Sequence, residues 1–376
     1  MGITGIICEY NPLHLGHKKQ LDLLKAQGHG VVCLMSGNFV QRGAPAIVDK
    51  MARAEAAVRC GADLVLELPM TAALSSAEGF AAEGVRILSH FCDDLCFGAE
   101  TADADALKAL ASALLSPEFP KHLRSELDKG LSFPVARTAA LEAMGLDASP
   151  LASPNNILAV EYCKAILAQD STMQPMPILR QGSYHDTLPD AENPSATAIR
   201  AMMPGGNWLE YIPEEARATL SAASIHTLAA GERAILCKLR TITDAEFEAL
   251  PYGSEGLWRK LMHASRSETT LEDVACAVKS KRYTRTRIDR MILCAFLGLT
   301  AADLATPAPY ARVLAFNDRG REILKAARQV FDLPNIGEKQ GHMYQLIEDR
   351  CDALYGLFAA DSPDSPDPKH RVRYVP

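Results

Sequence analysis

Short apolar runs alternate with helical patterns over the first two hundred residues of the chain, and no other feature constrains its fold as strongly. The apolar runs, which we expect to be buried strands, are Ile3–Cys8, Gly30–Met35, Asp63–Leu68, Leu95–Phe97 and Met176–Arg180. Helical spacing is found between these runs, over Leu15–Ala26, Asp49–Cys60, Asn155–Gln169 and a helix capped by Ser75 and Glu78 that ends near His90. Strands that alternate with helices predict an α/β fold, in which helices cover both faces of a mostly parallel sheet.

The pattern changes near Leu209–Ala216, where Pro213 interrupts it. Beyond this point the apolar spacing predicts helices with no strand between them, over Ala229–Arg240, Gly256–Ala264, Leu271–Ser280, Thr286–Leu297 and Gly320–Phe331. The last residues contain DSPDSPDP, a composition typical of disordered segments. We therefore predict an α/β domain over residues 1–212, a mostly α-helical domain over 213–359 and a flexible tail over 360–376.

Composition limits the classes of function. A chain of 376 residues has room for about two domains, and its 48% hydrophobic and 23% charged residues are typical of globular proteins. There are 39 Lys and Arg residues against 46 Asp and Glu, so the net charge is −7. That total argues against a protein whose whole surface binds polyanions, although a local basic segment remains compatible with it.

The cysteines and the apolar spans predict a cytoplasmic protein. The ten cysteines are scattered without a CxxC pair, as expected of small buried residues in a reducing compartment. The N-terminus has no charged region of the kind that begins a signal peptide. The longest apolar span, Met291–Ala302, is too short to cross a bilayer.

The segment His14-Leu15-Gly16-His17 carries the strongest chemical signal. It follows the first predicted strand and opens the first predicted helix, where unpaired N–H groups and the helix dipole suit a polyphosphate. Two histidines three residues apart share one helical face, and the glycine allows a nucleotide close to the backbone. A metal site is the first alternative, but no third ligand is indicated nearby, and an incidental structural pair is the second. We favour phosphate-binding histidines and predict no metal ligands in the protein.

Several longer segments make the chain recognisable. It contains GIICEYNPLHLGH, SGNFVQRGAPAIVDKMARAEAAVRCGADLVLELP, LCFGAE, PNNILAVEY, PSATAIR and, in the helical half, KSKRYTRTRIDRM. These segments resemble the bacterial tRNA(Met) cytidine acetate ligase family of the HxGH nucleotidyltransferase superfamily. The resemblance implies a Rossmann-like nucleotidyltransferase domain, followed by a helical domain that binds tRNA.

The resemblance also implies an activity. Such an enzyme joins acetate to ATP, which is expected to carry Mg²⁺, and releases pyrophosphate to leave acetyl-adenylate. It then acetylates the exocyclic amine of the wobble cytidine in elongator tRNA(Met). His14 and His17 would be catalytic. The implied ATP site comprises Ile7, Cys8, Glu9, Tyr10, Asn11, Pro12, Leu13, His14, Leu15, Gly16, His17, Lys18, Lys19, Gln20, Gly98, Asn155 (or, less favoured, Asn156) and Arg180.

Chemistry assigns further candidates around the ATP site. Acetate is ionised at neutral pH, so its activation needs positioning and charge stabilisation rather than a base. Ser195, Thr197 and Arg200 at the start of a helix could hold the β- and γ-phosphates, or Ser195 could be an ordinary N-cap with Arg200 on a solvated face. Transfer to cytidine should need a proton acceptor, for which Glu9 and Asp186 are both open. Small residues near Gly5 and Ser36-Gly37 are candidates for the acetyl pocket.

A basic segment in the helical half is the predicted tRNA contact. It contains Lys279, Lys281, Arg282, Arg285, Arg287 and Arg290, with Tyr283 between them. Such a run suits phosphates, and Tyr283 could stack on a splayed base, although a solvated helix face is the common alternative. We expect Arg42 to extend this surface towards the ATP site.

Two other functions compete with the ligase. One is a nucleotidyltransferase that acts on a small phosphorylated metabolite, for which the basic helical half would be superfluous. The other is a non-catalytic nucleotide- or tRNA-binding protein, against which the intact histidine pair and its flanking loop argue. Acetate-dependent turnover with and without tRNA separates the three.

Overall fold

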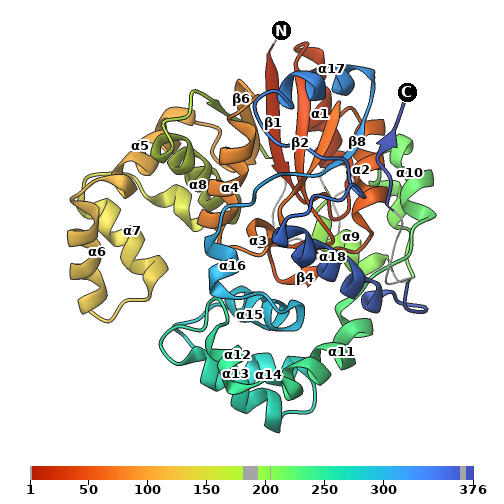
Figure 1. Ribbon diagram of the computed structural model, residues 1–376. Coiled ribbons are helices and arrows are strands. Elements are labelled where there is room, and N and C mark those ends of the chain that lie inside the picture. Colours follow the sequence, from red (N-terminus) through yellow and green to blue (C-terminus); the bar gives the residue numbers. More distant parts are fainter. Residues whose placement is uncertain (1, 181–193, 204, 365–369) are drawn as a thin grey trace.

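The predicted apolar runs form parallel strands of one sheet. The computed structural model describes residues 2–180, 194–203, 205–364 and 370–376. Within these residues the parallel strands are β1 (Ile3–Cys8), β2 (Gly30–Ser36), β5 (Leu64–Leu68), β6 (Asp94–Ala99) and β7 (Gln174–Leu179). They belong to a seven-stranded sheet with the order β7-β6-β1-β2-β5-β8-β9 (Figure 1). The predicted α/β fold is confirmed.

Helices cover both faces of the sheet. Successive residues of β2 face opposite sides, and because all of them are apolar or small, both sides are buried. Val31, Cys33 and Met35 pack into one core. The helices of that face are α1 (Leu15–Ala26), α2 (Lys50–Arg59), α9 (Ala196–Met202) and α10 (Glu214–Ser221). Val32 and Leu34 pack into the other core. The helices of that face are α4 (Ala77–Leu88), α5 (Ala104–Leu115), α8 (Pro154–Ala168) and α17 (Asp318–Ala327).

Two strands from the end of the chain complete the sheet, so the prediction of no strand beyond residue 216 is wrong. β8 (Val313–Phe316) pairs antiparallel with β5, and β9 (Arg373–Tyr374) pairs parallel with β8. β8 is a buried run of four residues, which is too short for periodicity to separate a strand from a helix. Both residues of β9 are exposed, so its pairing comes from β8 and not from an apolar pattern of its own. Residues 370–376 of the predicted flexible tail therefore lie against the sheet.

The start of α4 also differs from the prediction. Ser76, not Ser75, is its N-cap, and its Oγ accepts a hydrogen bond from Gly79 N at 3.3 Å. Ser75 follows the C-cap Leu74 of the short helix α3 (Met70–Ala73) and donates its hydroxyl to Thr71 O at 2.8 Å. Glu78 pairs with Lys164 at 2.8 Å instead of closing a capping box. Adjacent serines offer the same capping chemistry, and only the preceding turn selects between them.

The remaining helices form two groups beside the sheet (Figure 1). In the yellow group at one side, α5 is followed by α6 (Phe119–Asp128) and α7 (Phe133–Ala143). The other group comprises α11 (Leu228–Thr241), α12 (Asp244–Glu248), α13 (Leu257–Ser267), α14 (Leu271–Val278), α15 (Arg285–Leu297), α16 (Ala301–Ala305) and α18 (Met343–Tyr355). Its core includes Phe39, Met70 and Leu74 from the first hundred residues, so it packs directly on loops of the α/β part.

Buried charges connect the end of the chain to the α/β part. Lys50 on α2 contacts Glu67 on β5 at 2.9 Å and Asp352 on α18 at 2.6 Å. Arg312, next to β8, contacts both carboxylates, at 2.8 Å and 3.2 Å. Loss of one partner would leave an uncompensated buried charge, so this network specifies where α18 packs.

The described residues contain no helix long and apolar enough to cross a membrane. Eight of the ten cysteines are buried or partly buried, whereas Cys237 and Cys276 are exposed. Burial of the free thiols was the prediction, and it fails only for the two that lie on the outer helices α11 and α14.

Candidate active site

A cavity of about 630 Å³ lies at the carboxyl ends of β1, β6 and β7. The strand order reverses between β1 and β6, because β2 and β5 follow on the other side of β1. Ligands of open α/β sheets bind at such a reversal. The first turn of α1, the β3 (Phe39–Val40) and β4 (Ala44–Pro45) hairpin, the start of α8 and the start of α9 complete the walls.

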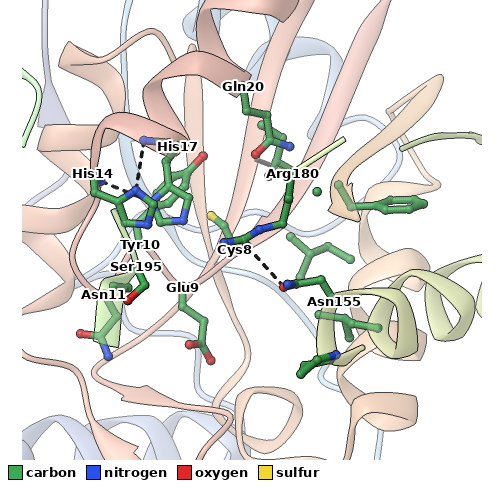
Figure 2. A pocket seen from close by; sticks show the side chains of 18 of the residues that line it. Cys8, Glu9, Tyr10, Asn11, His14, His17, Gln20, Asn155, Arg180 and Ser195 are labelled. Carbon is green, nitrogen blue, oxygen red and sulfur yellow. Dashed lines mark hydrogen bonds between the residues drawn. The ribbon is translucent and has the colours of Figure 1, made fainter. Parts of the chain in front are cut away.

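The two histidines are fixed by the end of α1. His14 is the N-cap, and its Nδ1 accepts a hydrogen bond from Gly16 N at 3.1 Å. His17 Nδ1 in turn accepts one from His14 N at 3.3 Å, which completes a reciprocal capping box. The rings stack with their centroids 3.7 Å apart (Figure 2). Each histidine therefore satisfies a backbone donor and also lines the cavity.

Both imidazoles are neutral, which leaves their Nε2–H groups able to donate to a ligand. Burial, followed by the charges of Arg180 and Arg200, lowers the pKa of His14 from 6.5 to about 3. Burial, followed by His14 and Arg180, holds the pKa of His17 well below 6.5. Since Nδ1 of each ring accepts an N–H, its single proton is assigned to Nε2. The pair thus presents two N–H donors without a positive charge, which suits stabilisation of charge on phosphate oxygens.

We expect acid to destabilise the wild-type protein more than a His14→Asn variant. Below pH 6.5 the unfolded chain protonates His14, whereas the folded chain does so only near pH 3, so falling pH favours unfolding. At about pH 5 this difference amounts to about 2 kcal/mol. Asn retains an N-cap acceptor and does not titrate. Urea unfolding at about pH 8 and about pH 5 measures the effect, and an equal pH dependence of the two proteins would contradict it.

Two arginines border the same space. Arg200 on α9 donates to the Asn11 carbonyl at 2.6 Å and to Thr197 Oγ1 at 3.1 Å, so it leans over the loop before α1 instead of standing on a solvated face. Ser195 is the N-cap of α9 and accepts from Ala198 N at 3.1 Å, so the capping alternative holds for this residue. Arg180, after β7, donates to Asn155 Oδ1 at 3.3 Å (Figure 2).

The two asparagines at the start of α8 have different surroundings. Asn155 lines the cavity, and its amide nitrogen donates to Glu100 at 2.6 Å. Asn156 is buried, and its Oδ1 accepts from Thr101 N at 2.9 Å. Asn155 is therefore the one that a ligand can reach, whereas Asn156 fixes the turn after β6.

The cavity brings together most of the predicted ATP-site residues. Those that line it are Ile7, Cys8, Glu9, Tyr10, Asn11, His14, Gly16, His17, Lys19, Gln20, Gly98, Asn155, Arg180, Ser195, Thr197 and Arg200. Pro12, Leu13, Leu15 and Lys18 do not. Leu13 is part of the core under the sheet, and Lys18 is turned outward to Asp22 and Glu215. In a contiguous segment some side chains face the cavity and others face the core or the solvent, so only some of them can contact a ligand.

The small residues that we considered for the acetyl pocket do not face the cavity. Neither Gly5 nor Ser36-Gly37 lines the cavity. A Cβ on Gly5 would lie 2.8 Å from Leu88, and one on Gly37 would lie 2.3 Å from Glu67 Oε1, so both glycines permit core packing. Asp186, the other open proton acceptor, lies outside the described residues.

Sequence reasoning missed two parts of the wall. One is apolar and comprises Phe80, Phe97, Leu158 and Tyr162. The other is the hairpin, of which only Arg42 had been expected near the ATP site and Val40, Gln41, Ala44 and Pro45 had not. The hairpin follows the carboxyl end of β2, and the rule that ligands bind at the carboxyl ends of parallel strands could have found it.

The basic segment is only partly available to a ligand. Arg285 pairs with Glu272 and Asp289, each at 2.7 Å, and Arg287 donates to the Tyr252 carbonyl at 2.8 Å. Arg290 donates to the Gln41 carbonyl at 3.3 Å and stands over the Tyr252 ring. Lys279, Lys281 and Arg282 precede α15 and are exposed, although Arg282 also contacts Glu255 at 2.7 Å. The segment thus has a structural half on α15 and an exposed half before it.

Comparison with known proteins gives consistent matches over most of the chain. The family model described as HIGH Nucleotidyl Transferase matches residues 1–365. The tRNA(Met) cytidine acetate ligase of Clostridium novyi is 39% identical over 356 residues, which cover 89% of both chains. That of Clostridium acetobutylicum is 34% identical over 372 residues, or 92% of both chains.

Solved structures agree with the sequence matches. The crystal structure of apo Thermotoga maritima TmcAL has a TM-score of 0.90 and 30% sequence identity, with 100% of both chains covered. The structure of the same protein bound with alpha-thio ATP has a TM-score of 0.87, again with 30% identity and full coverage.

Proposed function

Because this chain belongs to the HIGH nucleotidyltransferase family and, within it, to the tRNA(Met) cytidine acetate ligases, we propose that it acetylates the wobble cytidine of elongator tRNA(Met) with acetate and ATP. The cavity at the carboxyl ends of β1, β6 and β7 is the proposed site of both chemical steps. Both tRNA and ATP are cytoplasmic, and we place the reaction there.

The observation that carries the first step is the pair of neutral Nε2–H donors at the start of α1, with Arg180 and Arg200 at the same cavity. A carboxylate oxygen of acetate attacks the α-phosphorus of ATP, the bond to the β-phosphate breaks, and pyrophosphate leaves. Negative charge builds up on the phosphate oxygens, where the four groups can stabilise it. Acetate is already ionised, so no protein base is required.

The apolar wall of the cavity suits adenosine. Phe97 and Tyr162 offer aromatic surface, and their ring centroids lie 5.3 Å apart. Asn155 and Gly98 lie at the same side, where an amide and an approachable backbone can recognise polar edges of a base or ribose. With adenosine on this wall, we expect the triphosphate to extend towards His14 and His17.

Mg²⁺ would reach the site with ATP. Among the described residues no group of three or more His, Cys, Asp or Glu could hold a metal ion, and Glu9 is the only acidic residue of the described cavity wall. Mg²⁺ commonly keeps several waters and binds substrate phosphates rather than an all-protein cage. When bound, it would neutralise phosphate charge, while the orientation comes from the histidines and arginines.

The helices beyond residue 213 are the proposed tRNA-binding part. We assign the phosphate contacts to Lys279, Lys281 and Arg282, because they are exposed. Arg285, Arg287 and Arg290 then act by holding α15 in place against Glu272, Tyr252 and the hairpin. Local charge in this segment is compatible with the net charge of −7 for the whole chain.

One assay tests the function. The protein is incubated with labelled acetate and ATP, with and without tRNA(Met), and pyrophosphate, acetyl-adenylate and acetylated cytidine are followed. The proposed ligase forms pyrophosphate and labelled acetyl-adenylate only with acetate, and it then transfers the label to tRNA(Met). Acetate-independent turnover of a phosphorylated metabolite would instead indicate the alternative nucleotidyltransferase, and absence of turnover would indicate a binding protein.

A further inference from the structure

Glu9 occupies a defined position in the cavity wall. Its Oε1 accepts a hydrogen bond from Gln41 N at 2.8 Å. Its main chain is held as well, because its carbonyl accepts from Arg53 Nη1 at 2.7 Å and Arg53 is fully buried. Figure 2 shows the carboxylate pointing away from His14 and His17. The side chain therefore faces a part of the cavity other than the histidine pair.

The hairpin that binds Glu9 is itself held against α15. The Gln41 carbonyl accepts from Arg290 Nη1 at 3.3 Å, so Gln41 contacts Glu9 through its N–H and α15 through its C=O. Gly43 has a φ of +78°, and a Cβ at this position would lie 2.4 Å from Arg290 N and 2.5 Å from the Asp289 carbonyl carbon. Only a glycine allows this contact between the hairpin and the backbone of α15.

The second step of the proposed function needs a proton acceptor. The cytidine N4 lone pair attacks the acetyl carbonyl carbon, the bond from that carbon to the phosphate oxygen of AMP breaks, and one N4 proton must leave. The imidazoles are poor acceptors, because Nδ1 of each is already occupied by an N–H and Nε2 carries the proton. Lys19, Arg42, Arg180 and Arg200, the cationic residues of the described wall, are donors.

We propose that Glu9 accepts the N4 proton during acetyl transfer, and that the hairpin Phe39–Pro45, seated on α15 through Gly43 and Arg290, positions its carboxylate. The products are acetylated cytidine, AMP and protonated Glu9, so atoms and charge balance. The inference rests on the proposed acetyl transfer. It also connects the helix that follows the exposed basic segment to the reacting centre through Gln41.

The test uses acetyl-adenylate supplied directly with saturating tRNA(Met), so that ATP activation is bypassed. Glu9→Gln keeps an acceptor for Gln41 N–H but removes the base. The single-turnover rate of acetyl transfer should fall by about 10²–10⁴-fold, with an unchanged melting temperature. A wild-type transfer rate in Glu9→Gln would overturn the inference. If wild-type protein acetylates no tRNA, the proposed function itself has failed.

Gly43→Ala tests the positioning. Gly130→Ala is the matched control, because Gly130 has a φ of +83° but nothing within 4 Å of its Cβ position. We expect Gly43→Ala to lower the transfer rate by about 10-fold or more and Gly130→Ala to leave it unchanged. In a Glu9→Gln background Gly43→Ala should have almost no further effect, because both changes act on one group. Independent, multiplying losses would refute the role of the hairpin.

Discussion

A double variant, His14→Asn with His17→Ala, should form acetyl-adenylate at least about 10³-fold more slowly than the wild type. Loss of one preorganised donor to a developing oxyanion commonly lowers a rate by about 10²–10³-fold. Both imidazoles are neutral, so the loss concerns directed N–H donors and not net charge. The rate is measured as acetate-dependent pyrophosphate release in the absence of tRNA, which isolates the first step.

The controls separate catalysis from folding. Asn at position 14 preserves an N-cap acceptor for the Gly16 N–H, so α1 should still form. His263→Ala removes an exposed histidine of α13 and should have no effect on the rate. A folded double variant with wild-type pyrophosphate release would show that the pair is structural, which was the second alternative from the sequence.

Charge reversal at Lys279, Lys281 and Arg282, each replaced by Glu, should weaken tRNA binding by about 10³-fold and flatten its salt dependence. Phosphate contacts release counterions, so each lost contact reduces the slope of log affinity against log salt by about 0.7–0.9. These three side chains are exposed, and with partners among the described residues only Arg282 forms an ion pair, a solvated contact worth little. Filter binding over a salt series measures both quantities.

A second triple variant controls for net charge. Lys121 and Arg124 on α6 and Lys129 at its C-cap are also exposed, and their replacement by Glu changes the total charge equally. We expect it to bind tRNA nearly as the wild type does. Equal weakening in the two variants would mean that net charge, rather than the segment before α15, controls binding. Replacement of Arg285 or Arg287 by Glu is a poorer test, because it would also break contacts that hold α15 in place.

The α/β part was predictable because the apolar spacing and turn residues of each segment suffice to locate its strands and helices, without knowledge of distant contacts. Apolar runs bounded by glycine, proline and polar turns identified five strands, and their helices differ by only a few residues from the predicted ranges. The histidine pair was predictable for the same reason, since the strand, the turn, the N-cap and the helix are contiguous. Asn155 required a choice that the sequence left open, and only the cavity wall separates it from Asn156.

The errors concern contacts between distant residues. β8 lies between two predicted helices and β9 lies in the predicted flexible tail. They are strands because β8 pairs with the edge of β5 and β9 then pairs with β8. Arg285, Arg287 and Arg290 form a basic run in the sequence, but Glu272, Tyr252 and Gln41 come from other elements and engage them. The sequence identifies which residues are basic, but it does not reveal which carboxylates or carbonyls lie next to them in the folded protein.

By itself, then, the sequence determined the sheet of parallel strands, the helix N-terminus with its two histidines, and the family. These depend on periodicity, capping and spacing within about thirty residues, where neighbours in the chain are neighbours in space. The tertiary structure alone decided which loop residues face the cavity, that both imidazoles are neutral, and that Gln41 joins Glu9 to α15. Burial and long-range hydrogen bonds exist only after packing, so no local pattern encodes them.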